Sequence, residues 1–243
     1  MTVEQNAPRV DLDRLAAAAR SVLACPADVQ LVVDGIDDIT LGLDAGAHLV
    51  MDDSDGYPVF ACPTDSVLAL AGMERRSALL TLGSGVGAPG SATRQAGLTL
   101  AGRLETTGHE ACECCSEVRA VVTLHLNFVL LTRGDDAGSQ FRVPLGAFLA
   151  EEHALNRGYL QRSTEHTNSC HQDELRRAVS TTTDTRLASV IGVALSDLSP
   201  DGVTLSWVDT EGAHRRHLDF PRRATTAAEL VELLRSELHA GIC

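Results

Sequence analysis

Short apolar runs at close spacing constrain the fold of this chain more than any other feature. Roughly seven or eight such runs occur between residues 29 and 145, separated by turn-forming sequences such as DGIDD, DAGA, DSDG and GDDAGS. Runs of this length, interrupted in this way, are typical of antiparallel strands joined by tight turns. The sequence therefore predicts an antiparallel barrel or sandwich over residues 29–145.

The individual runs predict where the strands lie. VQLVV, ITLGL, HLVMD and YPVFAC come first, SALLTL and AGLTLAGRLE follow a helical piece at Asp65–Met73, and VRAVVTLHLNFVLLTR reads as one long strand or a strand pair before QFRVPL. Ahead of them, Asp11–Ala24 places apolar side chains at helical spacing, and Asp11 can cap that helix. These segments together predict a first domain at residues 1–150.

The last third of the chain has a different pattern. Residues 146–158 and Ser163–Val179 have helical spacing, three strands are predicted between residues 185 and 220 with breaks at SPDG and TEG, and Thr225–His239 is a final amphipathic helix. The sequence therefore predicts an α+β protein in which a small helix–three-strand–helix domain at residues 160–243 follows the first domain.

Composition narrows the range of partners. The chain carries 33 acidic and 20 basic residues, a net charge of -13, and only 3% of its residues are aromatic, so nucleic acid is not an expected partner. The N-terminal MTVEQNAPRVDLDRL lacks the apolar core of a signal peptide, and the longest apolar stretch, Ala120–Leu131, is too short to span a bilayer. We therefore expect no membrane partner and a cytoplasmic protein whose seven cysteines are reduced.

The sequence HEACECC places His109, Cys112, Cys114 and Cys115 close together. Thiolate and imidazole are ligands that zinc and copper prefer, so the three cysteines are candidate metal ligands. A closed structural zinc site usually draws on two separated Cys/His pairs, and no partner pair is evident in the sequence. The alternative is a loop of reduced thiols close to solvent.

A second cluster of potential ligands lies in TEHTNSCHQDEL. On one straight helix capped by Ser163 or Thr164, His166 and Cys170 lie four residues apart on one face, whereas His171 points about 140° away from His166. A straight helix therefore cannot aim both imidazoles at one metal ion. On spacing alone, the segment is expected to pack and to form hydrogen bonds at the junction of the two domains.

This segment and its surroundings resemble a known family. Glu165-His166-Thr167-Asn168-Ser169-Cys170-His171 is similar to the His-Met-Asn-x-x-His-like helix that opens the small domain of the HugZ-type haem-utilisation proteins, relatives of the pyridoxamine 5'-phosphate oxidase-like, FMN-binding split barrels. GVALSDLSPDGVTLSW and RRHLDFPRRATTAAELVELLRSEL are similar to the strand pair and the strand–Pro–helix ending of that domain. YPVFACPTDSVLALAGMERRSALLTL is similar to the strand, helix and strand order of the barrel. The resemblance covers most of the chain and implies a split β-barrel at residues 1–150.

The resemblance implies a cytoplasmic haem-handling protein that binds haem and, if it is an enzyme, degrades it. Haem iron needs an imidazole or thiolate, and the propionates need cations. The candidates in this sequence are His166, His171 and Cys170 for the iron and Arg162 and Arg176 for the propionates. Two other functions stay open, a flavin-dependent oxidoreductase and a non-catalytic regulatory protein.

The resemblance also bears on flavin and on oligomeric state. Flavin-binding split barrels hold the FMN phosphate with Arg, Lys, Ser and Thr at particular strand positions. Only Arg75, Arg76 and Ser77 align loosely with such a segment, so FMN is expected to bind weakly if at all. Members of the family generally pair through barrel faces, which implies a homodimer.

Overall fold

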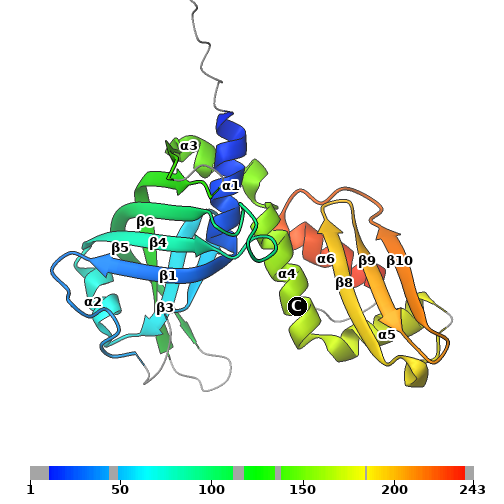
Figure 1. The fold of residues 1–243 in the computed structure, drawn as a ribbon. Helices are drawn as coiled ribbons and strands as arrows, with labels where there is room; N and C mark the ends of the chain where they lie inside the picture. Colours follow the sequence, from blue (N-terminus) through cyan, green and yellow to red (C-terminus); the bar gives the residue numbers. More distant parts are fainter. Residues whose placement is uncertain (1–10, 44–48, 112–117, 135–137, 184, 239–243) are drawn as a thin grey trace, which may run out of the picture. The chain divides into compact units, whose positions relative to one another are not determined.

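The computed structural model describes residues 11–43, 49–111, 118–134, 138–183 and 185–238. The chain forms two compact units, Met1–His153 (unit 1) and Ala154–Cys243 (unit 2), which are coloured along the sequence in Figure 1. Both units combine helices with antiparallel strands, so the predicted α+β class is confirmed.

Unit 1 is built on a curled antiparallel sheet (Figure 1). The strand order is β1-β4-β5-β6-β3-β2, and β7 pairs with β6 beside this path. Every pairing is antiparallel, as the short apolar runs predicted. The elements in chain order are α1 (Leu12–Ala24), β1 (Pro26–Val33), β2 (Met51–Ser54), β3 (Tyr57–Pro63), α2 (Val67–Met73), β4 (Ser77–Ser84), β5 (Gly97–Ala111), β6 (Val118–Thr132), β7 (Gln140–Arg142), α3 (Leu145–Phe148) and the short 3-10 helix Glu151–His153.

Alternating burial along the strands gives unit 1 its core. In β4, Leu80 and Leu82 are buried whereas Leu79 faces outward, so one face of the strand lines the core. Helix α1 closes this core, because Leu15 and Leu23 are buried in the same hydrophobic cluster as the strand leucines. The predicted N-terminal amphipathic helix is therefore confirmed, and it packs on the inner face of the sheet.

Two irregularities lie in the longest strands of unit 1. The register between β5 and β6 shifts between Ala101 and Gly102 and again between Thr106 and Gly108, as β-bulges do. A bulge increases the local twist, so these positions help the sheet to curl. Glycine is required at the first of them, because a Cβ on Gly102 would lie 2.0 Å from the carbonyl oxygen of His125.

One predicted strand is wrong. ITLGL, residues 39–43, forms turns and bends. The Asp38 carboxylate accepts hydrogen bonds from the backbone N–H and the hydroxyl of Thr40, at 2.9 and 2.6 Å, and so stabilises a turn. Ile39 and Leu43 are partly buried against the core of unit 1. Leu41 is 58% exposed, so the apolar run indicated partial burial correctly for two of its three large side chains and strand conformation incorrectly.

Unit 2 packs helices on a three-stranded antiparallel sheet of order β10-β9-β8 (Figure 1). The central strand β9 is the most buried, with Val203 and Leu205 fully enclosed. Their cluster includes Leu175 of α5 and Leu230 and Leu238 of α6. The elements are α4 (Arg157–Cys170), α5 (Gln172–Thr182), the short 3-10 helix Leu187–Ser189, β8 (Gly192–Ser199), β9 (Gly202–Val208), β10 (Ala213–Asp219) and α6 (Ala227–Leu238).

The helices of both units are short. The longest in the described ranges, α4, has 14 residues, which corresponds to about 21 Å at 1.5 Å per residue. None of the helices described here has both the length and the apolar character that crossing a membrane would require.

Candidate functional site

The segment with the two histidines contains a break between two helices. Helix α4 ends at Cys170, His171 leaves the helical conformation at φ -121° and ψ 36°, and α5 begins at Gln172. The straight helix expected over Ser163–Val179 is therefore wrong. The prediction that His171 points away from His166 assumed that straight helix, so it is wrong as well.

The start of α4 also differs from the prediction. Asn156 caps the helix, because its side chain accepts a hydrogen bond from the backbone N–H of Tyr159 at 3.0 Å. The predicted caps, Ser163 and Thr164, lie inside the helix, where the Thr164 hydroxyl donates to the carbonyl of Leu160 at 2.8 Å. Serine and threonine inside a helix can donate their hydroxyl hydrogen to the carbonyl four residues earlier. Ser163 and Thr164 were therefore a misleading sign of where the helix begins.

Three polar side chains, spaced four residues apart, donate hydrogen bonds to alternate backbone carbonyls at the edge of the sheet. The pairs are Asn168 with Leu195, Gln172 with Val193 and Arg176 with Ile191, at 2.9, 3.1 and 3.0 Å. Four helical residues advance about 6 Å and two strand residues about 6.6 Å, so the donors and the acceptors have matching spacing. We name this set of three side chains the edge ladder.

The edge ladder replaces a missing neighbour strand and fixes the helix break. Strand β8 lies at the edge of its sheet, and Asn168 also accepts the backbone N–H of Leu195 at 2.7 Å, so its amide pairs with that residue as a strand would. Gln172 donates a second hydrogen bond across the break, to the carbonyl of Asn168 at 2.7 Å. The two helices are thereby held in register with each other and with β8.

The break turns the ring of His171 toward that of His166. Their Nε2 atoms lie 3.3 Å apart, and the ring centroids lie 5.2 Å apart with the planes at 70°. The His166 side chain is exposed, whereas the side chain of His171 is only 12% exposed. An oxygen of Glu174 lies 4.0 Å from Nδ1 of His171. The structure thus brings together two candidate ligands that the straight-helix argument had separated.

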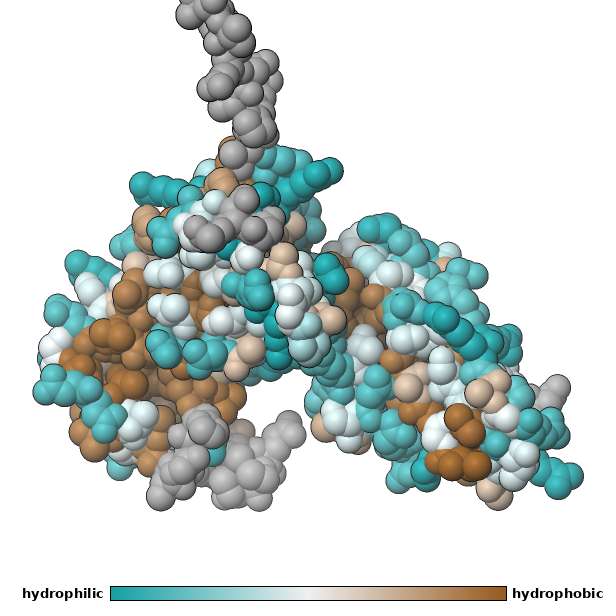
Figure 2. All heavy atoms as spheres, viewed as in Figure 1, coloured by the Kyte–Doolittle hydropathy of each residue, from teal (hydrophilic) through white to brown (hydrophobic). Residues whose placement is uncertain are grey.

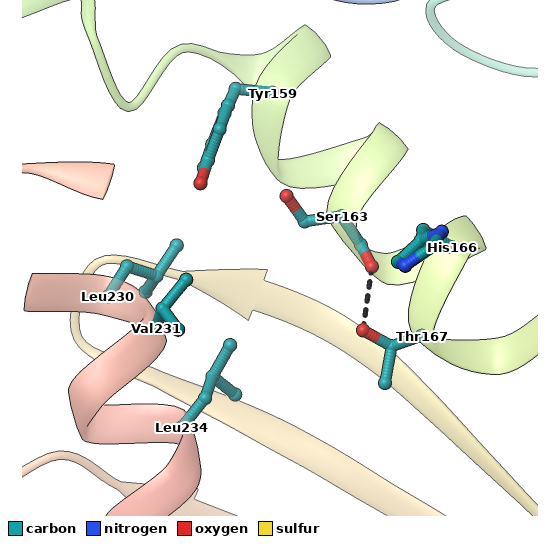
Figure 3. A pocket seen from close by; sticks show the side chains of 7 residues that line it. All are labelled: Tyr159, Ser163, His166, Thr167, Leu230, Val231 and Leu234. Atoms are coloured by element: carbon teal, nitrogen blue, oxygen red, sulfur yellow. Dashed lines mark hydrogen bonds between the residues drawn. The ribbon is translucent and has the colours of Figure 1, made fainter. Parts of the chain in front are cut away.

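A cavity of about 180 Å³ lies next to this imidazole pair, between α4 and α6. Figure 3 shows the hydroxyl groups of Tyr159 and Ser163 pointing into the space, across from apolar side chains of α6. The Thr167 hydroxyl is turned away, since it donates to the carbonyl of Ser163 at 2.8 Å. The lining residues are Tyr159, Ser163, His166 and Thr167 of α4 and Leu230, Val231 and Leu234 of α6.

The other haem candidates lie on the same two helices. Cys170 is exposed at the end of α4. Arg162 is exposed and precedes His166 by four residues, which places both on one face of α4. Arg176 is engaged in the edge ladder, and its guanidinium also lies 4.0 Å from the carboxylate of Asp173.

The cysteine cluster predicted as a metal site, Cys112, Cys114 and Cys115, lies outside the described residues. His109 is exposed in β5, opposite Ala120 of β6. Across the part of the chain that the structure describes, no group of three or more His, Cys, Asp or Glu side chains is arranged to hold a metal ion.

A polar cluster that was not predicted from the sequence lies at the turn between β9 and β10. Oδ1 of Asp209 accepts hydrogen bonds from the backbone N–H groups of Glu211 and Gly212, at 2.8 and 3.1 Å, and from Nε2 of His214 at 2.9 Å. The bond from His214 is the main cause that lowers the pKa of Asp209. The His214 ring stacks on Trp207 with centroids 5.2 Å apart. These contacts stabilise the hairpin. In the sequence, the position of Asp209 two residues before Glu211-Gly212 could have indicated this capped turn.

In unit 1, the arginines that align loosely with a flavin-phosphate segment are engaged with other groups. Arg75 pairs with Glu105, and this bond is the main cause that holds the pKa of Glu105 below its usual value. Arg76 lies 2.6 Å from the carboxylate of Glu74 and donates to the carbonyl of Asp34 at 3.0 Å. A phosphate at this place would have to compete with those carboxylates for the two cations.

Comparisons with known proteins give distant structural likenesses. No protein-family model matches the chain, and no curated protein matches it. A heme binding protein from Mycobacterium smegmatis is similar at 14% sequence identity and a TM-score of 0.41, over 93% of this chain and 98% of that one. A protein of unknown function from Agrobacterium tumefaciens is similar at 17% identity and a TM-score of 0.37, over 92% and 94%. Overlap at these TM-scores is too loose to transfer a fold or a function.

Proposed function

We propose that unit 2 binds haem and that His166 ligates the iron. The observation that carries the proposal is the position of this exposed imidazole, at the rim of a cavity lined by Leu230, Val231 and Leu234. Haem proteins place an imidazole or a thiolate on the iron, and an apolar surface beside it accommodates the macrocycle. When bound, haem would supply an iron centre for ligand exchange or electron transfer.

The size of the cavity limits how such a ligand is held. Its volume of about 180 Å³ lies below the roughly 300–1,000 Å³ of typical small-molecule pockets. It can therefore take only one edge of a tetrapyrrole, and the rest stays exposed. Arg162 is the candidate partner for a propionate, because it lies on the same face of α4 as His166. Arg176 would have to leave the edge ladder to act in the same way.

Only one of the two imidazoles fits as an iron ligand in this arrangement. Imidazoles on opposite sides of one iron stand about 4 Å apart, twice a metal–nitrogen bond of about 2 Å. The Nε2 atoms of His166 and His171 are 3.3 Å apart, which is shorter than this separation. His171 is therefore a candidate in place of His166 and not together with it, and Cys170 is a separate candidate for the iron.

The proposal rests on these residues and not on the heme binding protein from Mycobacterium smegmatis, whose TM-score with this chain is 0.41. We propose haem binding in the cytoplasm, by a protein whose unit 1 is a split β-barrel. Haem degradation is a further step, for which an electron donor has to be found. A non-catalytic regulatory role is the alternative to degradation. It is favoured if the Soret band of the bound haem persists after a reductant is added.

Haem titration followed by the Soret band tests this proposal. We expect a saturable Soret band in the wild type, and a loss of affinity of about 10-fold or more in His166→Ala, since the axial bond is lost. The matched control is His217→Ala, which removes an exposed imidazole of β10 in the same unit. A wild-type spectrum and affinity in His166→Ala would contradict the assignment of the iron to His166, and the same result in both His166→Ala and His171→Ala would remove the imidazole pair from the haem site altogether. Loss only in the combined variant Cys112→Ser/Cys114→Ser/Cys115→Ser would place the site at residues 109–115.

A homodimer through the outer face of the unit 1 sheet is part of the proposal. Figure 2 shows hydrophobic side chains gathered on unit 1 over β1 and its neighbours. Cross-strand partners place Val32, Leu79, Ala101 and Phe128 in one row, with Val32 63% and Leu79 43% exposed. Light scattering should give twice the 25.8 kDa of the chain for the wild type, and Leu79→Glu should shift it toward the monomer. A wild-type monomer over a broad concentration range would contradict the dimer.

Weak FMN binding remains a prediction. Its structural support is the engagement of Arg75 and Arg76 with Glu105 and Glu74. Titration of the purified protein with FMN, followed by flavin fluorescence, checks it. A stoichiometric flavin in fresh preparations would instead favour the flavin-dependent oxidoreductase.

A further inference from the structure

We propose that His166 and His171 together chelate a small divalent transition-metal ion, such as Cu²⁺, Ni²⁺ or Zn²⁺. The site consists of the two Nε2 atoms at the break between α4 and α5, with water in the remaining coordination positions. This inference goes beyond haem binding, because it needs both imidazoles and no apolar wall. It also stands if haem does not bind.

The distance between the two nitrogens carries the inference. A tetrahedral ion such as Zn²⁺, with metal–nitrogen bonds of about 2.0–2.1 Å, sets its ligand nitrogens about 3.3–3.4 Å apart, whereas neighbouring ligands of a square-planar Cu²⁺ or Ni²⁺ ion stand about 2.8–3.0 Å apart. The Nε2 atoms of His166 and His171 are 3.3 Å apart. Without an ion, the same two atoms are within hydrogen-bond distance, and the tautomer of each ring decides which nitrogen donates. The spacing therefore suits a shared tetrahedral ion and, in its absence, a direct hydrogen bond between the rings.

The site is preorganised by residues that take no part in binding. Asn168 and Gln172 hold α4 and α5 to β8 on either side of the break, and Gln172 also bonds Asn168 across it. The backbone N–H of His171 still donates to the carbonyl of Thr167 at 3.0 Å, which limits how far the break can open. Because the backbone is fixed by these bonds, ordering of the His166 side chain is the main entropic cost of binding.

The tautomer of His171 has a candidate partner. A metal-bound imidazole usually donates its other N–H to a carboxylate or a carbonyl, which orients the ring. The carboxylate of Glu174 lies 4.0 Å from Nδ1 of His171, the ring nitrogen that does not face His166. A small movement of that side chain would bring it within hydrogen-bond distance. Glu174 is thus a positioning residue for the chelate and not a ligand.

Two protein ligands imply modest affinity and open coordination positions. The described residues contribute no third His, Cys, Asp or Glu to a metal group, so water completes the shell. For two imidazoles the order of affinity among these ions should be Cu²⁺ above Ni²⁺ and Cu²⁺ above Zn²⁺. An ion held in this way can exchange its waters for an added anion or for a second imidazole.

Calorimetric titration of the full chain with NiCl₂ and ZnCl₂ tests the chelate. All variants carry Cys112→Ser/Cys114→Ser/Cys115→Ser, so that the cysteine cluster cannot bind the ion. We expect one ion per chain, a loss of affinity of about 100-fold in His166→Ala and in His171→Ala, and a smaller loss of about 10-fold in Glu174→Gln. His217→Ala is the control and should bind as the parent does.

A second measurement uses a chain with all nine histidines intact. Substoichiometric Cu²⁺ should broaden the ring proton resonances of His166 and His171 before those of the other histidines. Three results would each overturn the chelate. They are no binding in the Cys112→Ser/Cys114→Ser/Cys115→Ser background, unchanged affinity in both histidine variants, and earlier broadening of another histidine. The haem titration separates the two ideas, because His171→Ala should lose the ion while His166 still ligates haem. A wild-type chain that binds the ion but gives no saturable Soret band overturns only the haem proposal.

Discussion

The two units of this chain complete the hydrogen bonding of their sheets in different ways. In unit 1, β4, β5, β6 and β3 each lie between two other strands, so backbone groups satisfy one another. In unit 2, the edge strand β8 is satisfied by the side chains of Asn168, Gln172 and Arg176. In unit 1 the buried Arg20 of α1 forms an ion pair with Asp53 of β2 at 3.5 Å, but no ladder of helix side chains follows a strand among the contacts described. In unit 2 such a ladder fixes α4 and α5 in register with β8.

This difference explains where the candidate site lies. The core of unit 1 closes through apolar contacts of α1. Such contacts tolerate a volume-conserving exchange, for example leucine for methionine, at a small cost in stability. The edge ladder of unit 2 instead defines the rotation of α4 and α5, and thereby the position of His166 and His171. A side-chain pair can be held at a defined distance only where its supporting backbone is held in this way.

The largest expected effect compares the two cores. Leu124→Ala in β6 and Leu205→Ala in β9 each remove a fully buried side chain, and each should lower the free energy of unfolding by about 2–5 kcal/mol. Trp207 is the single tryptophan, so its fluorescence in urea reports on unit 2, while circular dichroism reports on both units. Leu205→Ala should lower the Trp207 midpoint. If Leu124→Ala lowers the Trp207 midpoint equally, the two units unfold as one cooperative block, and the proposed difference between them does not extend to stability.

The bulge in unit 1 provides the next effect. Gly102→Ala should cost about 1–3 kcal/mol, because the new Cβ would lie 2.0 Å from the backbone carbonyl of His125 and the strands must separate. Gly108→Ala is the matched control at the second bulge of the same strand, where a Cβ meets nothing within 4 Å. Its effect should stay within about 0.5 kcal/mol. Urea denaturation measures both, and equal effects would show that close approach at the first bulge is unimportant.

The edge ladder should show a comparable or smaller effect, confined to unit 2. Asn168→Ala removes both side-chain bonds to Leu195 and should cost about 1–3 kcal/mol. Hydrogen exchange at the Leu195 amide should become faster, since its acceptor is lost. Ser169→Ala, at the next and exposed position of α4, should leave that exchange rate unchanged. Unchanged protection in Asn168→Ala would mean that β8 does not depend on the helices.

The smallest expected effect concerns the start of α6. Glu229 accepts hydrogen bonds from the hydroxyl and the backbone N–H of Thr225, at 2.7 and 2.8 Å, and pairs with Arg222. The Thr225 hydroxyl bond is the largest cause that lowers the pKa of Glu229 to about 2. Since the folded pKa lies below the usual 4.5, the ionised carboxylate stabilises the fold above about pH 4.5, and this stabilisation is lost as the pH falls toward 2.

The measurement is the thermal midpoint of Glu229→Gln against the wild type. The variant should melt below the wild type at pH 7, and the difference should shrink between pH 5 and 3. Glu232→Gln, at an exposed position of the same helix, should follow the wild type throughout. A difference that does not depend on pH would show that the carboxylate charge has no part in capping α6.

Local patterns determined much of unit 1. The alternation of apolar residues in SALLTL reappears as the alternating burial of β4, and Leu15 and Leu23 lie on the buried face of the predicted helix. Such patterns work because a strand or an amphipathic helix repeats its contacts every two or about 3.6 residues, within one short segment. The same logic placed His166 and Cys170 on one face of α4.

Only the tertiary structure decided the geometry of the candidate site. A local period describes an uninterrupted helix, and so it predicted that His166 and His171 point apart. The break at His171 is fixed by Asn168, whose partner Leu195 is 27 residues away in sequence. A hydrogen bond to a backbone carbonyl does not require any particular side chain at the acceptor, so nothing in the sequence of β8 indicates it. The 3.3 Å between the two imidazole nitrogens is therefore a property of how the helices meet the sheet edge.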